Sequence, residues 1–234
     1  MKRVSVAMAV YNGETYVTDQ LDSILQQLGE KDEVVVSDDG STDHTPEIIR
    51  SYAAADRRIR FVNGPGLGIK QNIAHAIAQT KGAYIFLADQ DDVWMPHKVE
   101  RVLNVFQEKK CHVVIHDCIV TNADLQQVIY PSFFEYRGYG AGMWRNIWKN
   151  KYIGCCMAIR RELLPYILPI PDDIQMHDQW IGVINDKHRG GCGVLKEPLL
   201  YYRRHEHTVS DFHRNTVPVM MKNRLIFMYR LIGR

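Results

Sequence analysis

The stretch AYIFLADQDD, residues 83–92, joins an apolar run of strand length to a cluster of carboxylates. An unbroken apolar run of this length is typical of a strand that is buried on both faces of a sheet. The acidic residues that follow, Asp89, Asp91 and Asp92, lie where such a strand opens onto a loop. Carboxylates in that position can hold a hard divalent cation. The alternative is a solvated acidic turn ahead of a helix that starts near Pro96, and the rest of the sequence decides between the two.

Strands and helices alternate around this stretch. Apolar runs and helical spacing predict, in chain order, a strand at 4–10, a helix at 16–28, a strand at 33–37, a helix at 45–54, a strand at 59–63, a helix at 70–79, the strand at 83–88 and a helix at 97–109. This rhythm indicates an α/β fold with a mainly parallel sheet and helices on both faces. Further strands are expected at 112–121, 153–159 and 193–202, with a helix at 177–187.

Polar clusters follow three of the predicted strands, at 12–14, 38–41 and 89–92. Ligands of parallel sheets bind beyond the carboxyl ends of the strands, so the three clusters predict one ligand site at a single edge. Helix capping explains Thr42 and Asp43 but not Asp38 and Asp39, because adjacent carboxylates repel each other. A carboxylate at this strand end can accept a hydrogen bond from a pyrimidine N3–H or from a ribose hydroxyl.

The composition is that of a globular protein, with 46% hydrophobic and 24% charged residues among 234. A net charge of +2 offers no support for nucleic-acid binding. The five cysteines include no CxxC pair, which predicts free thiols in a reducing compartment. The apolar run near the N-terminus is too short for a secretory leader or a membrane span. We therefore expect a cytoplasmic protein.

One domain is expected at 1–215, followed by a basic segment at 216–234. Residues 203–234 carry seven Lys and Arg against two acidic residues. Residues 217–232 can form an amphipathic helix, and three uses are open for it: docking on the domain, dimerisation, or contact with an anionic membrane. Two interpretations are likewise open for the aromatic segment at 130–148: ordinary packing, or a wall of a substrate pocket.

Five motifs stand in a characteristic order. They are VAMAVYN at 6–12, VSDDGSTD at 36–43, GLGIKQN at 66–72, KGAYIFLADQDDVW at 81–94 and HDQW at 177–180. Together they resemble the family 2 inverting glycosyltransferases, which have the GT-A fold, and the resemblance covers about residues 3–205. The pairing of DQDDVW with a later HDxW is similar to bacterial rhamnosyltransferases of O-antigen and capsule synthesis. The resemblance implies a GT-A-type domain whose nucleotide-binding half is about 1–110 and whose acceptor half is about 111–215.

The resemblance also implies a site for a nucleotide-sugar donor, either dTDP-rhamnose or a UDP-hexose. Asp39 would read the base and Asp89 would contact the ribose. Asp91, at the end of the DxD motif Asp89-Gln90-Asp91, would ligate Mg²⁺ or Mn²⁺. For Lys70 and Asn72, contact with phosphate or sugar oxygens competes with an exposed helix start. The full set implied in donor binding is Ala9, Tyr11, Asn12, Asp38, Asp39, Lys70, Asn72, Asp89, Gln90 and Arg204.

Asp178, in the motif HDQW, matches the catalytic carboxylate of the family. An inverting transfer by single displacement needs one base, which takes the proton from the acceptor hydroxyl as it attacks the anomeric carbon. The alternative for Asp178 is simple capping of the helix at 177–187. His205 would complete the metal shell or contact the diphosphate, with Arg204 as a further phosphate partner. His207 could replace His205, and a basic surface turn is the remaining interpretation.

Two other functions compete with a glycosyltransferase. A nucleotidyltransferase would need a basic, glycine-rich loop after the first strand, whereas residues 11–14 read YNGE, without Lys or Arg. A non-catalytic sugar-binding or membrane-binding module would not need to keep Asp39, Asp91 and Asp178 together. The expected partners are therefore a nucleotide-sugar donor and a glycan acceptor, free or lipid-linked, in bacterial surface polysaccharide synthesis. Peripheral contact of 216–234 with the inner face of the plasma membrane would fit a lipid-linked acceptor.

Overall fold

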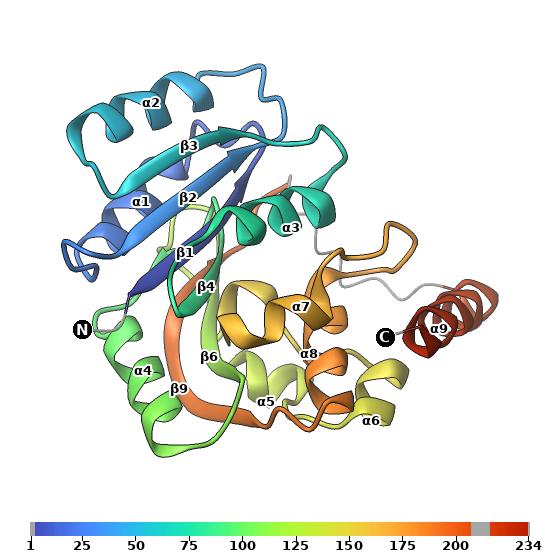
Figure 1. Ribbon diagram of the computed structural model, residues 1–234. Coiled ribbons are helices and arrows are strands. Elements are labelled where there is room, and N and C mark those ends of the chain that lie inside the picture. Colours follow the sequence, from blue (N-terminus) through green and yellow to red (C-terminus); the bar gives the residue numbers. More distant parts are fainter. Residues whose placement is uncertain (1–2, 207–215, 234) are drawn as a thin grey trace.

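Within residues 3–206 and 216–233, which the computed structural model describes, nine strands form one sheet (Figure 1). The strands are β1 (Val4–Val10), β2 (Glu33–Asp38), β3 (Ile59–Asn63), β4 (Tyr84–Asp89), β5 (Val93–Trp94), β6 (Val113–Thr121), β7 (Val128–Tyr130), β8 (Met157–Arg160) and β9 (Cys192–Arg203). Their order is β3-β2-β1-β4-β8-β6-β9-β5, with β7 paired to β6. Strands β3, β2, β1 and β4 are parallel, whereas β8 runs antiparallel to both of its neighbours. The sheet is therefore mixed and mainly parallel.

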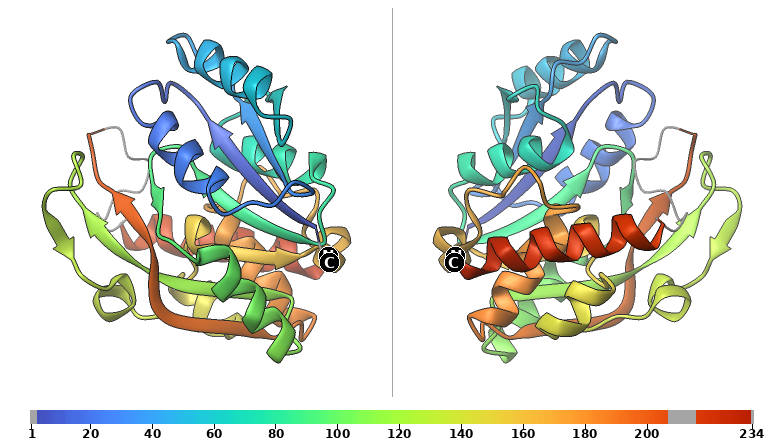
Figure 2. Two further views of the ribbon diagram at one scale, coloured as in Figure 1. Left: turned by 90° about the vertical axis from the view of Figure 1, so that its left-hand side faces the viewer. Right: turned by 90° about the vertical axis from the view of Figure 1, so that its right-hand side faces the viewer.

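The helices cover both faces of this sheet. They are α1 (Val17–Leu25), α2 (Thr45–Ala55), α3 (Ile69–Gln79), α4 (Lys98–Glu108), α5 (Phe133–Arg137), α6 (Met143–Trp148), α7 (Leu164–Ile167), α8 (His177–Lys187) and α9 (Val217–Ile232), with short 3-10 turns η1 (Gly154–Cys156) and η2 (Arg161–Leu163). One core layer takes side chains from α1, α2 and α4, and the other takes them from α3, α8 and α9. Figure 2 shows α9 lying across the outside of the second layer.

The two buried faces explain the unbroken apolar runs of the sequence. Successive side chains of a strand point to opposite faces. In β4, Tyr84 and Phe86 enter one core layer, whereas Ile85 and Leu87 enter the other. A strand that is covered on one side only would need polar residues at every second position. The apolar part of the stretch at 83–92 therefore indicates a strand in the centre of the sheet.

Most predicted elements are confirmed, and the differences have local causes. The predicted strand at 153–159 begins instead at Met157, because residues 154–156 form the turn η1. Elements β5, β7, α5, α6 and α7 were not predicted. They are two to six residues long. Such segments are too short to show a period of 2.0 or 3.6 residues.

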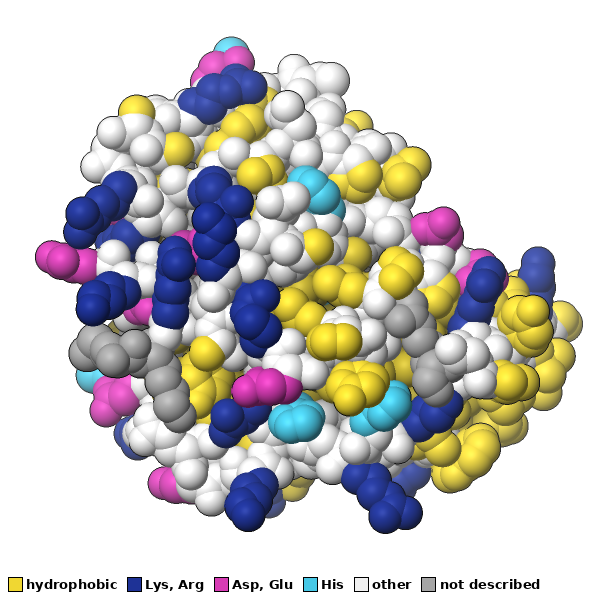
Figure 3. Space-filling model, viewed as in Figure 1, with side chains coloured by type: hydrophobic (Ala, Val, Ile, Leu, Met, Phe, Trp, Pro, Cys, Tyr) yellow, Lys and Arg dark blue, Asp and Glu magenta, His cyan; other side chains and the backbone are white. Residues whose placement is uncertain are grey.

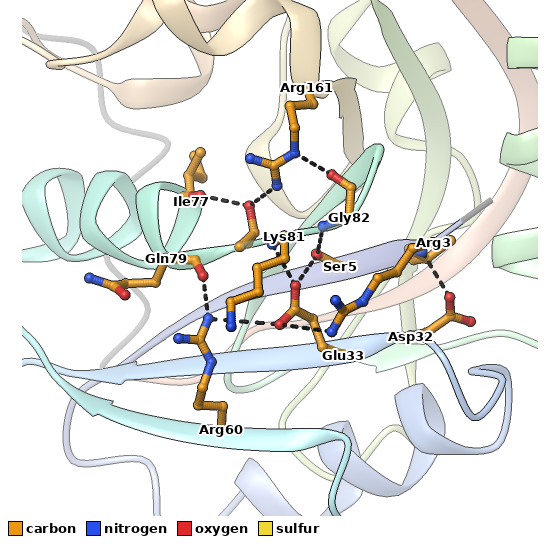
Figure 4. Close-up of polar contacts among 12 residues, drawn as sticks. Arg3, Ser5, Asp32, Glu33, Arg60, Ile77, Gln79, Lys81, Gly82 and Arg161 are labelled. Atoms are coloured by element: carbon orange, nitrogen blue, oxygen red, sulfur yellow. Dashed lines mark hydrogen bonds and ion pairs between the residues drawn. The ribbon is translucent and has the colours of Figure 1, made fainter.

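A buried polar network closes the amino-terminal edge of the sheet (Figure 4). Glu33, 5% exposed, accepts hydrogen bonds from the Ser5 hydroxyl at 2.6 Å and from the Lys81 backbone N–H at 2.5 Å. Its other oxygen pairs with Arg3 at 3.5 Å and Arg60 at 3.7 Å. Paired and hydrogen-bonded in this way, a buried carboxylate is stable and structural.

Candidate active site

The loops after β1 and β2 interlock at the carboxyl edge of the sheet. The Asn12 backbone N–H donates to the Ser41 hydroxyl at 2.8 Å, and the Asn12 side-chain oxygen accepts from the Thr42 N–H at 2.8 Å. Asn12 has a φ of 48°, which asparagine tolerates better than most residues. The Gly13 N–H donates to Thr45 in α2 at 2.7 Å. These contacts give the segment at 11–14 a defined shape beside Asp39, as a nucleotide pocket requires.

Gln90 joins the end of β4 to the end of β1. Its side chain accepts a hydrogen bond from the Tyr11 N–H at 2.8 Å and donates one to the Tyr11 carbonyl at 2.9 Å. A Cβ atom at Gly13 would lie 2.4 Å from the Gln90 side-chain oxygen, so a larger residue there would push the Gln90 amide away from Tyr11. Ala9 is buried in the same region and pairs with Asp89 in the β1–β4 register. The Tyr11 side chain, in contrast, is 55% exposed at the mouth of the site. The Gln90 amide thus holds the two loops together, and its contact with the donor stays a prediction.

Asp38 and Asp39 avoid mutual repulsion because they have different partners. The Asp38 carboxylate accepts from the backbone N–H and the hydroxyl of Ser41. These contacts close a turn within the loop of Asp38, and the donor contact of Asp38 stays a prediction. The two Asp39 oxygens accept from the N–H groups of Gly66 at 2.8 Å and Gly68 at 2.6 Å. Both glycines have positive φ, 69° and 84°, a conformation that other residues rarely adopt. Asp39 is half-buried and held in place at the edge of the site.

Lys70 and Asn72 form hydrogen bonds with backbone carbonyl groups of the protein. The Lys70 ammonium donates to the carbonyls of Asp172 at 2.6 Å and Ile174 at 2.5 Å. Asn72 is 1% exposed, and its amide donates to the carbonyls of Ser37 at 2.8 Å and Val10 at 3.2 Å. The predicted contacts of both residues with phosphate or sugar oxygens stay predictions. Within the protein, Asn72 ties β1 to β2, and Lys70 anchors the loop that leads into α8.

The structure brings Asp91 and His205 together from positions 114 residues apart. The Nε2 atom of His205 lies 2.8 Å from a carboxylate oxygen of Asp91. The two side chains are 17% and 10% exposed, so ions can still reach them. The His205 ring packs against Tyr16 with 4.7 Å between ring centres. The two side chains form a hydrogen bond with each other, and their sharing of a metal ion stays a prediction. His207, the predicted alternative, lies outside the described residues.

Asp92 lies in the core rather than at a helix start. It is fully buried, its Oδ1 atom accepts from the Arg203 backbone N–H at 3.2 Å, and α4 begins only at Lys98. Its Oδ2 atom has no N–H or O–H partner among the described residues. Ligand atoms of Asp92, Asp89 and Cys155 lie within 4.8 Å of one another. Burial, followed by the charges of Asp91 and Asp89, raises the pKa of Asp92 well above its ordinary value. The acidic cluster thus extends inward from the surface.

Crowding of carboxylates favours a cation at this edge. Burial, then the charges of Asp91 and Asp178, raises the pKa of Asp89 to about 7. A divalent cation would relieve this repulsion, and carboxylate oxygens with one imidazole form a donor set that suits Mn²⁺ and is compatible with Mg²⁺. The Cys155 thiol does not suit a hard cation, because burial raises its pKa well above the ordinary value and keeps it protonated. The residues that could hold a hard cation are Asp91 with His205, which contact each other, and Asp89 with Asp92, whose carboxylate oxygens lie within 4.8 Å of each other.

Asp178 lies in the first turn of α8 and faces the same carboxylates. It is 5% exposed and accepts from the Asn150 side-chain amide at 3.1 Å and from the Gln179 N–H at 2.6 Å. Burial raises its pKa to about 6, although these hydrogen bonds lower it in part. The N-cap position of α8 is Met176, but the Asp178 carboxylate still accepts from an N–H of the first turn, so helix capping and catalysis both stay open for it. Asp178 is thus a buried carboxylate whose pKa lies within reach of neutral pH.

Two buried cations near the site were missed from the sequence. Arg203 pairs with Asp19 of α1 at 2.9 Å and donates to the Ala123 carbonyl at 3.0 Å, which fixes the end of β9 beside Asp92. The Lys98 ammonium donates to the Cys155 carbonyl at 3.0 Å and lies 4.0 Å from the centre of the Trp94 ring. Neither residue has a local sequence signal. The sequence does not distinguish Arg203 from its neighbour Arg204. Lys98, at the start of a predicted helix, would be expected to be exposed.

Arg204 lies near the aromatic segment at 130–148, because its charge acts on Tyr130. Tyr130 and Tyr136 stack with 3.9 Å between ring centres. A hydrogen bond to Tyr136 raises the pKa of Tyr130, and the charge of Arg204 opposes this rise. In the segment at 130–148, Phe133 and Phe134 are buried by packing. The two tryptophans of α6 are not buried.

Comparison with known proteins agrees with this geometry. The family model described as Glycosyl transferase family 2 matches residues 5–184, which include both Asp91 and Asp178. The chain belongs to glycosyltransferase family 2. This family 2 domain is 33% identical over 111 residues to TuaG of Bacillus subtilis, a putative teichuronic acid biosynthesis glycosyltransferase, an alignment that covers 46% of this chain and 43% of TuaG. An uncharacterized glycosyltransferase of Nostoc sp. is 30% identical over 213 residues, with 87% of this chain and 65% of that protein aligned. The chain thus spans less than two thirds of the length of both relatives.

Solved structures confirm the expected GT-A fold of this family 2 domain. S. aureus TarS 1–349 in complex with UDP-GlcNAc superposes with a TM-score of 0.75 at 19% identity, over 97% of this chain and 66% of that one. The mannosyltransferase PcManGT from Pyrobaculum calidifontis, in complex with GDP-Man and Mn²⁺, superposes with a TM-score of 0.65 at 19% identity, over 100% of this chain and 65% of that one. Across the described residues, none of the helices combines the length and the hydropathy that crossing a membrane requires.

Proposed function

We propose that this protein is a metal-dependent, inverting glycosyltransferase that moves a sugar from a nucleoside-diphosphate donor to a glycan hydroxyl. The observation that carries the proposal is that Asp91 and Asp178 both lie close enough to Asp89 to affect its charge, while His205 contacts Asp91. The charge of Asp178 contributes to the raised pKa of Asp89, which places the two carboxylates within one electrostatic environment. A base that takes the proton from the attacking hydroxyl and a cation that would stabilise the departing diphosphate must both lie near the same anomeric carbon.

Asp178 would act as the general base. Its carboxylate would take the proton from the acceptor hydroxyl while the hydroxyl oxygen attacks the anomeric carbon on the side opposite the diphosphate. A single displacement of this kind inverts the anomeric configuration. The Asn150 amide and the Gln179 N–H would hold the carboxylate in one orientation. With a pKa of about 6, the carboxylate is ionised at neutral pH and retains a basicity suited to proton transfer.

Asp91 and His205, with Asp89 beside them, would hold Mg²⁺ or Mn²⁺. When bound, the ion supplies Lewis-acid stabilisation of the charge on the departing nucleoside diphosphate. The Mn²⁺ in the PcManGT complex supports a divalent ion in this fold. On the donor side, Asp39 would read the base against the backbone of residues 9–12, and Asp89 would meet the ribose. Arg204 would assist the phosphates.

The donor would be a nucleotide sugar, because the TarS and PcManGT structures contain UDP-GlcNAc and GDP-Man. Because of the motifs DQDDVW and HDQW, we rank dTDP-rhamnose first and UDP-hexoses second among the proposed donors. Residues 1–110 would form the donor half and residues 111–215 the acceptor half. The name of TuaG supports a place in bacterial surface polysaccharide synthesis, with a glycan acceptor that is free or lipid-linked.

The free thiols of all five cysteines support a cytoplasmic location, with peripheral contact at the inner face of the plasma membrane. A nucleotidyltransferase is disfavoured because the loop at 11–14 has no Lys or Arg with which to hold a triphosphate. A non-catalytic sugar-binding or membrane-binding module is disfavoured because such a module has no use for a buried base beside a cation site.

A donor panel tests the proposal. dTDP-rhamnose, UDP-hexoses and GDP-mannose would each be incubated with the protein and either Mn²⁺ or Mg²⁺, and release of the nucleoside diphosphate would be measured. One donor should be consumed in a metal-dependent manner, and nuclear magnetic resonance of the product should show an inverted anomeric centre. Release of pyrophosphate from a nucleoside triphosphate would instead indicate a nucleotidyltransferase. Retention of configuration would exclude Asp178 as the single base.

A further inference from the structure

Helix α9 buries little of its own apolar surface. Phe227 and Leu231 pack inward, and the Phe227 ring lies 5.7 Å from the ring of Trp180 in α8. The side chains at 217, 221, 225, 228 and 232 recur every three or four residues, so they form one stripe along the helix. All of them are exposed. The exposed apolar residues of α9 are Val217, Val219, Met221, Leu225, Met228, Tyr229 and Ile232.

Two tryptophans of α6 adjoin this stripe. Trp144 and Trp148, four residues apart on one side of α6, are 69% and 64% exposed. Arg224 of α9 lies over the Trp148 ring at 3.9 Å and donates to the Trp148 carbonyl at 2.8 Å. The two helices therefore present a single surface, which we call the α6–α9 surface. Figure 3 shows hydrophobic side chains gathered over α9 at the right of the molecule, and Figure 2 shows α9 spanning that side.

The charges of this surface have one sign. The segments 137–151 and 216–233 contain seven of the 29 Lys and Arg residues and none of the 27 Asp and Glu residues. Arg145, Lys149 and Lys222 are exposed beside the apolar side chains. Arg230 is neutralised by a two-pronged ion pair with Asp173, at 2.8–3.1 Å. A second copy of the protein would bring the same positive charges face to face, which disfavours dimerisation through this surface.

We propose that the α6–α9 surface lies on an anionic phospholipid membrane. An interfacial helix of this kind buries an apolar face at the level of the headgroups, and neighbouring Lys and Arg residues bind the anionic lipids. Exposed tryptophans are favoured at that depth because the ring is apolar and its N–H is polar. The tryptophans come from α6, so the binding surface extends beyond the amphipathic helix itself.

The position of α9 would link the membrane to the catalytic helix. Lys187 at the end of α8 donates to the Leu231 carbonyl at 2.5 Å, and Phe227 packs on Trp180, two residues after Asp178. Arg230 holds Asp173 in the loop before α8. Binding of α9 to a membrane would therefore fix the orientation of Asp178 relative to that membrane. The purpose of this arrangement, delivery of a lipid-linked acceptor, rests on the proposed function.

Co-sedimentation with lipid vesicles tests the proposal, without donor or acceptor. The protein should bind vesicles that contain phosphatidylglycerol, bind vesicles of pure phosphatidylcholine weakly, and dissociate as the salt concentration rises. Three double variants should each bind at least about tenfold more weakly: Trp144→Ser with Trp148→Ser, Leu225→Ser with Ile232→Ser, and Arg145→Glu with Lys149→Glu. All of these side chains are exposed, so the variants should unfold at the same temperature as the parent protein.

Matched controls lie on other surfaces of the protein. Lys109→Glu with Lys110→Glu makes the same change in charge at the end of α4, and Val128→Ser removes an apolar side chain that is 53% exposed. Both controls should bind vesicles like the parent protein. Absence of binding to anionic vesicles, or equal losses in the controls, would overturn the proposal. A dimer that is lost in the Leu225→Ser, Ile232→Ser variant, without vesicle binding, would assign the surface to a second copy. Donor hydrolysis, measured separately, would show whether the proposed function fails independently.

Discussion

Asp178 combines burial with hydrogen bonds that favour its charged form. Burial raises its pKa to about 6, and the Asn150 and Gln179 donors keep the rise limited. Replacement by asparagine keeps the shape of the side chain and removes its basicity. We expect Asp178→Asn to lower the rate of transfer by roughly 10²–10⁴-fold, with nearly unchanged affinity for the donor. Transfer rates and calorimetric binding would be measured in parallel.

The control for this substitution is Asp172→Asn, an exposed carboxylate six residues earlier in the chain, which should transfer at the rate of the parent protein. Turnover of Asp178→Asn at the parent rate would mean that another group accepts the proton.

The pKa of Asp178 also predicts the pH dependence of the reaction. The base acts only when its carboxylate is ionised, and the ionised fraction falls as the pH drops below the pKa. We expect kcat/KM to be level above about pH 7 and to fall toward tenfold per pH unit below about pH 6. Initial rates from pH 5 to 8 with a saturating metal ion would measure this. An inflection near pH 4 would indicate a base without the burial seen here.

At the scale of elements, α9 is attached to the domain by few side chains. Phe227 is 2% exposed and contacts Trp180, whereas its neighbour Met228 is 36% exposed. Phe227→Ala should therefore lower the free energy of unfolding by about 3–5 kcal/mol, because it leaves a cavity between α9 and α8. Met228→Ala, the matched control, should change it by less than about 0.5 kcal/mol. Urea denaturation followed by circular dichroism would measure both.

Equal effects of the two substitutions would mean that α9 is not packed through Phe227. A loss of helical signal without a change in the main unfolding transition would mean that α9 melts separately from the domain.

The candidate metal site brings together residues from two distant parts of the chain. Asp91 follows β4 near the middle of the sheet, and His205 follows β9, the last strand of the domain. A ligand that binds both should stabilise the complete fold by about 2.7 kcal/mol at 100 times its Kd, which corresponds to a rise in Tm of roughly 5–11 °C. We expect this rise with Mn²⁺ and a nucleoside diphosphate together. Asp91→Ala should remove the metal-dependent part of it and of nucleotide binding.

Asp19→Ala is the control, because Asp19 pairs with Arg203 near the site and is not one of the residues proposed to bind the metal ion. That variant should keep a metal-dependent rise in Tm, though from a lower starting temperature. If Asp91→Ala kept the full rise, the cation would have to be held by other residues.

Sequence by itself determined the elements and their order, because hydrophobic periodicity is local. The apolar runs at 4–10, 33–37 and 83–88 identified central strands, and the motifs around Asp91 and Asp178 indicated the family. Tertiary structure decided what each polar side chain contacts, since that depends on residues far away in the chain. Gln90 and Asn72 form hydrogen bonds that connect neighbouring strands or the loops after them, and Asp92 is buried in the core. The pairing of Asp91 with His205, and the tryptophans of α6 beside α9, likewise exist only once the sheet and its helices have packed.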